Sequence, residues 1–275
     1  MLEENRRTAA TGDVRETAIR NPLPIGLNVR QTGTNMTRTM RKGLSLLTRT
    51  AFVRAIIQHR VVAAVEHLKP IRFCAANTLI DAGANKGQFS LAFRTIRPRA
   101  HIIAFEPLPE AAGTFEELFA TDDLTRLERT ALGPNAGSAK FYVADRTDSS
   151  SLLELGAAQE RAFGVRQATT IEVPVERLDE SIDFTLLAHP IMLKVDVQGG
   201  EQGVFEGCDT LTEIDFIYVE LSFVELYHDQ PLFSQVNGYL EQRGFRIMGV
   251  FNQVVTAEYG PTQVDVLFER IPAKP

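Results

Sequence analysis

Residues 78–90, "TLIDAGANKGQFS", place an acid, two glycines and an asparagine at the end of an apolar run. The pattern indicates a buried strand, a tight turn and the start of a helix. Gly83 and Gly87 allow positive φ angles and allow a ligand to approach the backbone without meeting a Cβ atom. Ligands of open α/β sheets bind beyond the carboxyl ends of the strands, so this turn predicts a ligand site.

The spacing of this turn indicates which class of ligand it binds. Dinucleotide sites use G-x-G-x-x-G to place pyrophosphate on a helix N-terminus, whereas here three residues separate Gly83 from Gly87. Asp81 at the strand tip suits a cation, and D-x-G-x-N-x-G suits the ammonium and sulfonium of S-adenosylmethionine. Asp81, Gly83, Asn85 and Gly87 are therefore predicted cofactor-binding residues, and an NAD-dependent Rossmann oxidoreductase is the enzyme alternative.

A second acid follows the next predicted strand. Residues 101–110, "HIIAFEPLPE", contain Glu106, nineteen residues after Gly87. An acid at about this distance accepts hydrogen bonds from ribose hydroxyls in nucleotide-binding folds. Asp81 and Glu106 are therefore expected to face one cavity from neighbouring strand tips and to hold the cofactor between them.

The rest of the chain alternates short apolar runs with helical patterns, which indicates a parallel sheet covered on both faces. Strands are expected over residues 78–80, 101–105, 126–130, 191–195, 216–221, 245–251 and 264–268, and helices over 87–96, 109–118, 200–207 and 231–242. Residues 138–145 and 169–178 alternate like antiparallel or edge strands, joined by a polar, Ser-rich loop.

The N-terminal part is basic and the remainder acidic. Residues 1–60 carry a net charge of +7 and the rest −13, within a total of −6. We expect residues 1–43 to be a flexible basic leader and residues 44–70 to form a helix that packs on the core and ends at Pro70. An acidic body without a basic patch argues against a nucleic acid partner.

The chain has no apolar run of about 20 residues that would span a membrane and no signal-peptide pattern. Its two cysteines, Cys74 and Cys208, are isolated in the sequence. These features predict a cytoplasmic protein with two buried thiols.

Motifs in consecutive order make the sequence resemble the FkbM family of S-adenosylmethionine-dependent methyltransferases. They are "DAGANKGQFS" (81–90), "FEPLPE" (105–110), "TALG" (130–133), "DSSSLL" (148–153), "VPVERLDE" (173–180), "LKVDVQGGEQGVFEG" (193–207), "VELSFVELY" (219–227) and "QVDVLFER" (263–270). The resemblance implies a Rossmann-like class I fold over residues 71–275, with seven strands of which the last is antiparallel. It also implies methyl transfer to a hydroxyl oxygen of a carbohydrate-like, glycan or other small-molecule acceptor.

Asp196 follows the expected strand 191–195 and should point into the same cleft, near the transferred methyl group. Lys194, two residues earlier on the same strand face, is expected to pair with Asp196 or Glu201. Asp196, Glu201 and Glu220 are hard oxygen ligands, but their spacing is not diagnostic of a metal site, and no metal is predicted.

His228, in the loop after the fifth strand, is the predicted catalytic base because histidine titrates near neutral pH. His59 and His67 are weaker candidates, too far apart on the expected helix to share a ligand, as are His101 and His189. The family likeness implies that Ala131 lies near the adenine. Asp148 and Ser149 to Ser151 are expected to close over the cofactor or to form a flexible surface loop.

A methyltransferase fold kept only as a non-catalytic cofactor-binding module is a further alternative. Asp81, Gly83, Gly87 and Glu106 favour retained cofactor binding but do not establish turnover. The sequence does not indicate the oligomeric state or the identity of the acceptor.

Overall fold

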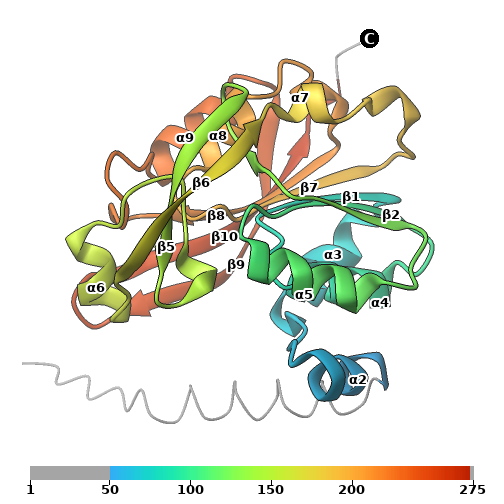
Figure 1. Cartoon of the computed structure of the whole chain (residues 1–275). Helices are drawn as coiled ribbons and strands as arrows, with labels where there is room; N and C mark the ends of the chain where they lie inside the picture. Colours follow the sequence, from blue (N-terminus) through green and yellow to red (C-terminus); the bar gives the residue numbers. More distant parts are fainter. Residues whose placement is uncertain (1–49, 273–275) are drawn as a thin grey trace, which may run out of the picture. The chain divides into compact units, whose positions relative to one another are not determined.

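A computed structural model describes residues 50–272 of the 275-residue chain. The predicted leader, residues 44–49 of the predicted helix and the last three residues lie outside the described part. The central sheet has the order β3-β2-β1-β7-β8-β10-β9 (Figure 1). Its strands are β1 (Thr78–Ala82), β2 (His101–Phe105), β3 (Thr125–Glu128), β7 (Ile191–Val195), β8 (Phe216–Ser222), β9 (Phe245–Thr256) and β10 (Gly260–Arg270).

The neighbouring strands β3, β2, β1, β7 and β8 are parallel, and β10 runs antiparallel to both β8 and β9. This is the class I methyltransferase arrangement, with the last strand of the chain inserted antiparallel near one edge. The predicted fold class is confirmed. The neighbours of β1 are β2, which follows it directly in the chain, and β7, which follows much later, so strand order reverses between β1 and β7.

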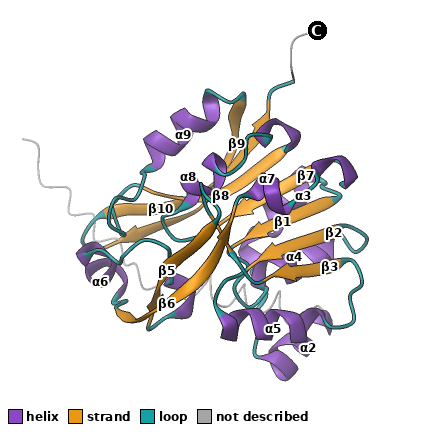
Figure 2. Ribbon diagram, turned by 45° about the horizontal axis from the view of Figure 1, so that its top comes forward, coloured by secondary structure: helices purple, strands orange, loops and turns teal. Residues whose placement is uncertain are grey.

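Helices cover both faces of this sheet (Figure 2). One face packs against α7 (Leu178–Ser181), α8 (Glu201–Glu206) and α9 (Phe233–Glu241), and the other against α2 (Thr50–His59), α3 (Leu68–Cys74), α4 (Gln88–Ile96) and α5 (Pro109–Phe119). Side chains alternate along β1, so Ile80 joins the α8 and α9 core while Leu79 joins the α3 and α4 core. No helix within residues 50–272 has the length and apolar character needed to cross a bilayer.

The region that interrupts the β/α alternation forms a second, three-stranded sheet with the order β4-β6-β5. Its strands are β4 (Ala131–Leu132), β5 (Gly137–Ala144) and β6 (Gln167–Glu176), with η2 (Thr147–Ser149) and α6 (Ala157–Phe163) between the last two. β5 and β6 are antiparallel, as the alternating pattern predicts. The expected strand 126–130 ends earlier, at Glu128, because Thr130 turns toward the small sheet and donates its hydroxyl to the carbonyl of Pro174 at 3.0 Å.

Within the described residues, the prediction of one continuous helix over residues 44–70 is wrong. α2 is followed by Arg60 with a φ of 56°, and an irregular segment leads to η1 (Val65–His67) and α3. Pro70, expected to end the helix, lies in the first turn of α3, where N–H groups lack intrahelical partners. The backbone N–H of Ala64 donates to the carbonyl of Gln88 at 3.1 Å, which fixes the segment against the first residue of α4.

Candidate active site

A cavity of about 410 Å³ lies at the carboxyl ends of β1, β2, β7 and β8, where strand order reverses. This is the position at which open α/β sheets bind ligands. Among the described residues, its charged lining consists of six carboxylates and one lysine, with one histidine beside them: Glu66, Glu106, Asp148, Asp196, Glu220, Asp265, Lys194 and His67. The excess of carboxylates suits a positively charged ligand and opposes a pyrophosphate.

Glu106 lines this cavity from the tip of β2. Its two carboxylate oxygens accept backbone N–H groups from Asn85 and Leu108, both at 2.8 Å. Burial raises the pKa of Glu106 to about 6, and these two hydrogen bonds oppose the rise. The structure thus brings Glu106 together with Asn85, which has a φ of 49° and also lines the cavity.

Asp81 does not face the cavity, and the prediction that it does is wrong. Its side chain is fully buried, with Oδ2 accepting the hydroxyl of Ser90 at 2.6 Å and Oδ1 lying 3.1 Å from Nζ of Lys194. Asp81 lies within β1, one residue before its end, where all five strand residues are buried. The ammonium of Lys194 occupies the place beside this carboxylate that the sequence assigned to a ligand.

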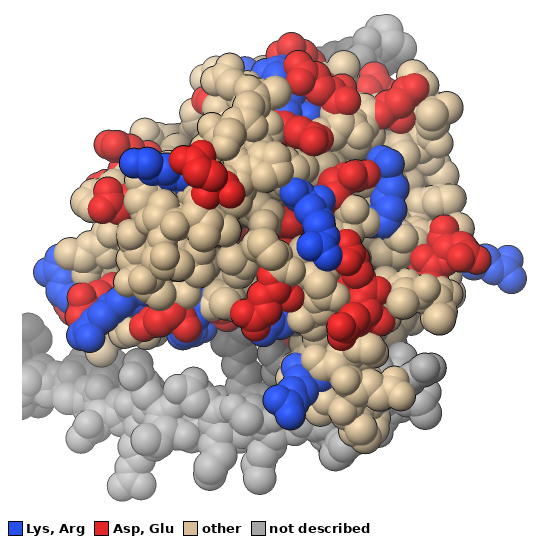
Figure 3. All heavy atoms as spheres, in the orientation of Figure 1, with Lys and Arg blue, Asp and Glu red and all other residues tan. Residues whose placement is uncertain are grey.

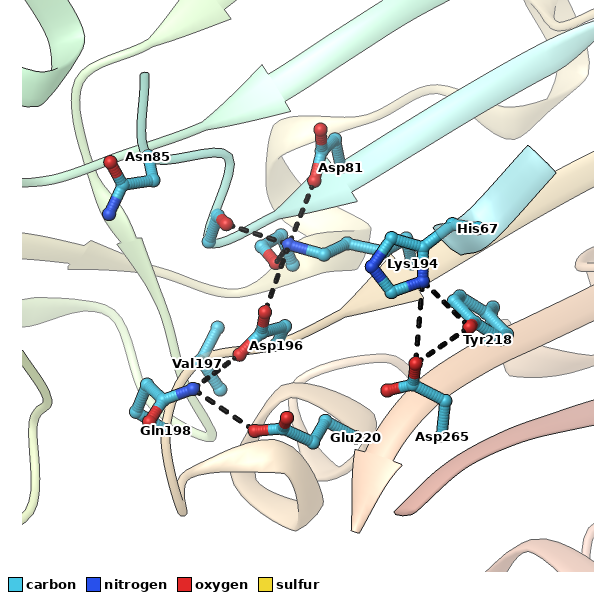
Figure 4. A network of polar contacts seen from close by, with 12 residues as sticks. His67, Asp81, Asn85, Lys194, Asp196, Val197, Gln198, Tyr218, Glu220 and Asp265 are labelled. Atoms are coloured by element: carbon cyan, nitrogen blue, oxygen red, sulfur yellow. Dashed lines mark hydrogen bonds and ion pairs between the residues drawn. The ribbon is translucent and has the colours of Figure 1, made fainter. Parts of the chain in front are cut away.

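Lys194 holds the turn after β1. Its Nζ donates to the carbonyls of Gly83 at 2.7 Å and Ala82 at 3.2 Å, and lies 3.9 Å from a carboxylate oxygen of Asp196 (Figure 4). Burial lowers the pKa of Lys194, but the negative charges of Asp81 and Asp196 outweigh burial and raise the pKa above its usual value. Lys194 therefore remains a cation, and its hydrogen bonds give it a positioning role.

The two glycines of the turn are required by neighbouring protein atoms. A Cβ on Gly83, whose φ is +73°, would lie 1.9 Å from the backbone oxygen of Asp196. A Cβ on Gly87, whose φ is +88°, would lie 2.9 and 3.0 Å from the rings of Phe119 and Phe115. Gly83 lines the cavity and Gly87 does not, so the expected ligand approach at Gly87 is wrong.

Asp196 and Glu220 are joined by a residue that the sequence did not single out. Nε2 of Gln198 donates to Asp196 at 2.6 Å and to Glu220 at 3.1 Å (Figure 4). Oε1 of Gln198 accepts the hydroxyl of Tyr227 at 2.8 Å. Burial and the charge of Asp196 raise the pKa of Glu220 well above its usual value. No spacing signal marked Gln198, which has a φ of 58° in the turn after β7.

Glu201 supports this turn from inside the protein. Its Oε1 accepts the backbone N–H groups of Gly199 at 2.9 Å and Val197 at 3.3 Å, so the predicted pairing with Lys194 is replaced by backbone contacts. Burial raises the pKa of Glu201 to about 7. Within residues 50–272, no group of three or more His, Cys, Asp and Glu side chains is arranged to hold a metal ion.

The Ser-rich segment is packed. Ser149 and Ser151 are buried, and the hydroxyl of Ser151 donates to the carbonyl of Gln198 at 2.7 Å. Asp148 and Ser150 line the cavity, as does Ala131. This segment therefore forms a packed wall of the cavity. It is not the flexible surface loop that was one of the two alternatives from the sequence.

The histidines are placed differently from the prediction. His228 is exposed, its backbone N–H donates to the carbonyl of Glu154 at 2.9 Å, and it does not line the cavity. His67 does line the cavity, where its Nδ1 lies 2.8 Å from the hydroxyl of Tyr218 and 3.3 Å from Asp265. The prediction of one continuous helix placed His67 on that helix and made it a weak candidate for the site.

A family model described as "Methyltransferase FkbM domain" matches residues 81–247, more than half of the chain. The chain belongs to the FkbM methyltransferase family. This membership makes the protein a methyltransferase and sets aside the oxidoreductase alternative.

Curated relatives agree with this membership. The FkbM chain is 29% identical over 182 residues to "2-O-methyltransferase NoeI" of Sinorhizobium fredii, covering 63% of this chain and 72% of the relative. It is 27% identical over 216 residues to "Methyltransferase sdnD" of Sordaria araneosa, covering 70% and 80%. Among solved structures, a putative O-methyltransferase from Klebsiella pneumoniae matches at a TM-score of 0.47 and 10% identity, covering 82% and 91% of the two chains.

Proposed function

We propose that this FkbM protein transfers the methyl group of S-adenosylmethionine to a hydroxyl oxygen of a carbohydrate-like or other small hydroxylated acceptor. The observation that carries the proposal is the cavity at the strand-order reversal, with Glu106 at the tip of β2 and a strong excess of carboxylates over cations. The relative named 2-O-methyltransferase supports an oxygen as the methyl acceptor.

The residues present fit the cofactor. Each oxygen of Glu106 uses one lone pair on a backbone N–H and retains another for a ribose hydroxyl. Asp196 has 40% of its side chain exposed, and it takes the role at the cationic end that the sequence assigned to Asp81. Ala131, next to Thr130 on the same wall, offers an apolar surface for the adenine.

When bound, S-adenosylmethionine supplies a methyl carbon activated by a positive sulfur leaving group. The protein's part is to align the acceptor hydroxyl with that carbon, an effect worth up to about 7 to 11 kcal/mol in well-oriented reactions. Lys194 fixes the turn that carries Gly83, and Gln198 fixes the carboxylate of Asp196 beside the cavity. These contacts preorganise the site.

The surface is mixed in charge. On the face shown in Figure 3, Lys and Arg side chains of the described residues lie singly among Asp and Glu side chains. A continuous basic surface, which a nucleic acid backbone requires, does not appear on that face. This agrees with a small hydroxylated acceptor.

Two measurements test the proposal. Titration calorimetry should detect binding of S-adenosylmethionine and none of NAD, and labelled methyl should pass to members of a panel of methyl glycosides and small alcohols. Asp196→Asn should lower turnover more than cofactor affinity. Cofactor binding without transfer to any acceptor would instead support the non-catalytic module, and absence of cofactor binding would overturn the proposal.

A further inference from the structure

His67 belongs to a polar cluster on the side of the cavity formed by η1, β8 and β10. The cluster consists of His67 on η1, Tyr218 on β8, and Asn252 and Asp265 on β9 and β10. Asp265 on β10 is the register partner of Glu220 on β8. Tyr218 on β8 is the register partner of Lys194 on β7. The cluster therefore lies next to the polar residues of β7 and β8 that line the cavity. Figure 4 shows His67 beside Tyr218 and Asp265.

The contact of Nδ1 with Tyr218 and Asp265 favours the tautomer of His67 that carries its proton on Nδ1. Tyr218 donates its hydroxyl to Oδ2 of Asp265 at 2.8 Å, and burial and the charge of Asp265 raise the pKa of Tyr218 far above its usual value. The hydroxyl of Tyr218 stays protonated and points its proton at Asp265. Its oxygen can therefore accept a hydrogen bond from Nδ1 of His67, which lies 2.8 Å away. Asn252 also donates from Nδ2 to Oδ2 of Asp265, at 2.8 Å, and the same Nδ2 lies 3.2 Å from Nδ1 of His67.

The other ring nitrogen is left as a proton acceptor. With the proton on Nδ1, Nε2 carries a lone pair, and within residues 50–272 it makes no hydrogen bond. About a fifth of the His67 side chain is exposed, and the residue lines the same cavity as Asp196 and Glu220. In Figure 4, Nε2 lies on the side of the ring away from Tyr218 and Asp265.

The imidazole is also held in place. Its ring centroid lies 5.4 Å from that of Phe89 and 5.5 Å from that of Tyr218. The segment that carries it is fixed to α4 through Ala64 and Gln88. A ring held on one nitrogen by Tyr218 and Asp265 and open on the other nitrogen has the arrangement of a general base.

We propose that His67 is the general base for the acceptor hydroxyl and that Asp265 is its positioning residue. This inference rests on the proposed function. The hydroxyl oxygen forms a bond to the methyl carbon while the carbon–sulfur bond breaks and its electron pair stays on sulfur. The hydroxyl proton passes to Nε2 of His67, and the resulting imidazolium is stabilised by Asp265 before the proton leaves to solvent.

Both residues lie outside residues 81–247, which match the family model. His67 comes from the segment before the matched part, and Asp265 from the antiparallel strand after it. The proposed base and its positioning residue therefore come from the two segments that flank residues 81–247.

The first test needs no acceptor. In the wild-type protein with ¹⁵N-labelled histidine, NMR shifts assigned by comparison with His67→Gln should show the proton on Nδ1 of His67. Asp265→Asn should change the tautomer populations, which a purely packing role for Asp265 would not do. A proton on Nε2 in the wild type would overturn the proposal whatever the transfer rates.

The second test compares His67→Gln with His101→Gln, an exposed histidine at the start of β2. His67→Gln should keep the Kd for S-adenosylhomocysteine and the thermal midpoint near those of wild type but lower labelled methyl transfer to methyl glycosides by about 10²- to 10⁴-fold. His101→Gln should change neither. Wild-type transfer rates in His67→Gln would overturn the base. If wild type itself transfers no methyl, the proposed function fails and the base assignment, which rests on it, fails too, whereas transfer by wild type with no loss in His67→Gln overturns the base alone.

Discussion

Asp81 and Lys194 are register partners on the adjacent strands β1 and β7, and their side chains meet at 3.1 Å with 0% and 7% of their surfaces exposed. The negative charge of Asp81 is therefore neutralised by Lys194 and not by a ligand. Lys194 also holds the turn after β1, because its Nζ donates to the carbonyls of Ala82 and Gly83. The ion pair is part of the scaffold that shapes the cavity.

Lys194→Met should lower the free energy of unfolding by about 3 to 5 kcal/mol, because it leaves Asp81 as an uncompensated buried charge. Adding Asp81→Asn should recover part of that loss, since the amide carries no charge. Urea denaturation of the single and double variants measures both effects. Lys140→Met, at an exposed position on β5, is the control and should change stability little. Additive effects of Lys194→Met and Asp81→Asn would show that the pair is not coupled.

Gly83→Ala should prevent folding or lower the free energy of unfolding by more than about 3 kcal/mol, beyond the range of most single substitutions. The reason is the backbone oxygen of Asp196, 1.9 Å from the new Cβ, which cannot move without shifting the end of β7. The matched control is Gly113→Ala, where a Cβ within α5 meets nothing within 4 Å. That change should stabilise by about 0.5 to 1 kcal/mol through helix propensity. Circular dichroism melts of both variants compare them, and equal stability would contradict the steric argument.

The sequence predicted the buried strands β2 and β7 well because they are nearly continuous apolar runs, whereas β9 (Phe245–Thr256) and β10 (Gly260–Arg270) extend beyond the predicted 245–251 and 264–268. β2 and β7 have the predicted bounds, and the helices α4, α5, α8 and α9 lie within one to two residues of theirs. Glu106 was also located correctly, since a parallel strand delivers the residue after it to the cavity edge. These features follow from local patterns, which a single sequence contains.

Contacts between distant residues could not be predicted in the same way. The glycines of the turn were recognised, but the atoms that exclude a side chain belong to Asp196, Phe115 and Phe119, far along the chain. Likewise, the apolar spacing of residues 44–68 suggested one helix, and only the docking of Ala64 on Gln88 shows why the chain leaves helical geometry there. His67 was undervalued for the same reason.

Glu106→Gln should weaken binding of S-adenosylhomocysteine by about 1 to 3 kcal/mol, through loss of charged hydrogen bonds to the ligand. The amide keeps one acceptor for the backbone N–H groups of Asn85 or Leu108, so the loop is disturbed less than by alanine. The titration is best done at pH 8, since the pKa of Glu106 is about 6 and the carboxylate is then ionised. Glu110→Gln, exposed in the first turn of α5, is the control. Equal affinities in the two variants would remove Glu106 from the site.

Glu201 makes the stability of the protein depend on pH with a definite sign. Burial raises its pKa from 4.5 to about 7, so the folded state binds a proton that the unfolded state releases. The stabilisation from this group is complete below about pH 4.5 and is lost as pH rises through about 7. At one pKa unit per 1.36 kcal/mol, the loss is about 3 kcal/mol.

Glu201→Gln should therefore raise the free energy of unfolding at pH 8 by about 1 to 3 kcal/mol and flatten its decline between pH 4.5 and 8. The uncharged amide oxygen still accepts the backbone N–H of Gly199, so the turn before α8 is kept. Glu206→Gln, exposed at the end of the same helix, tests whether a glutamate on α8 has this effect wherever it lies. Urea titrations at several pH values measure the slopes. A wild-type stability that rises between pH 4.5 and 8 and is unaffected by Glu201→Gln would mean that Glu201 is ionised in the folded protein at little cost, and that solvent reaches the turn behind the cavity.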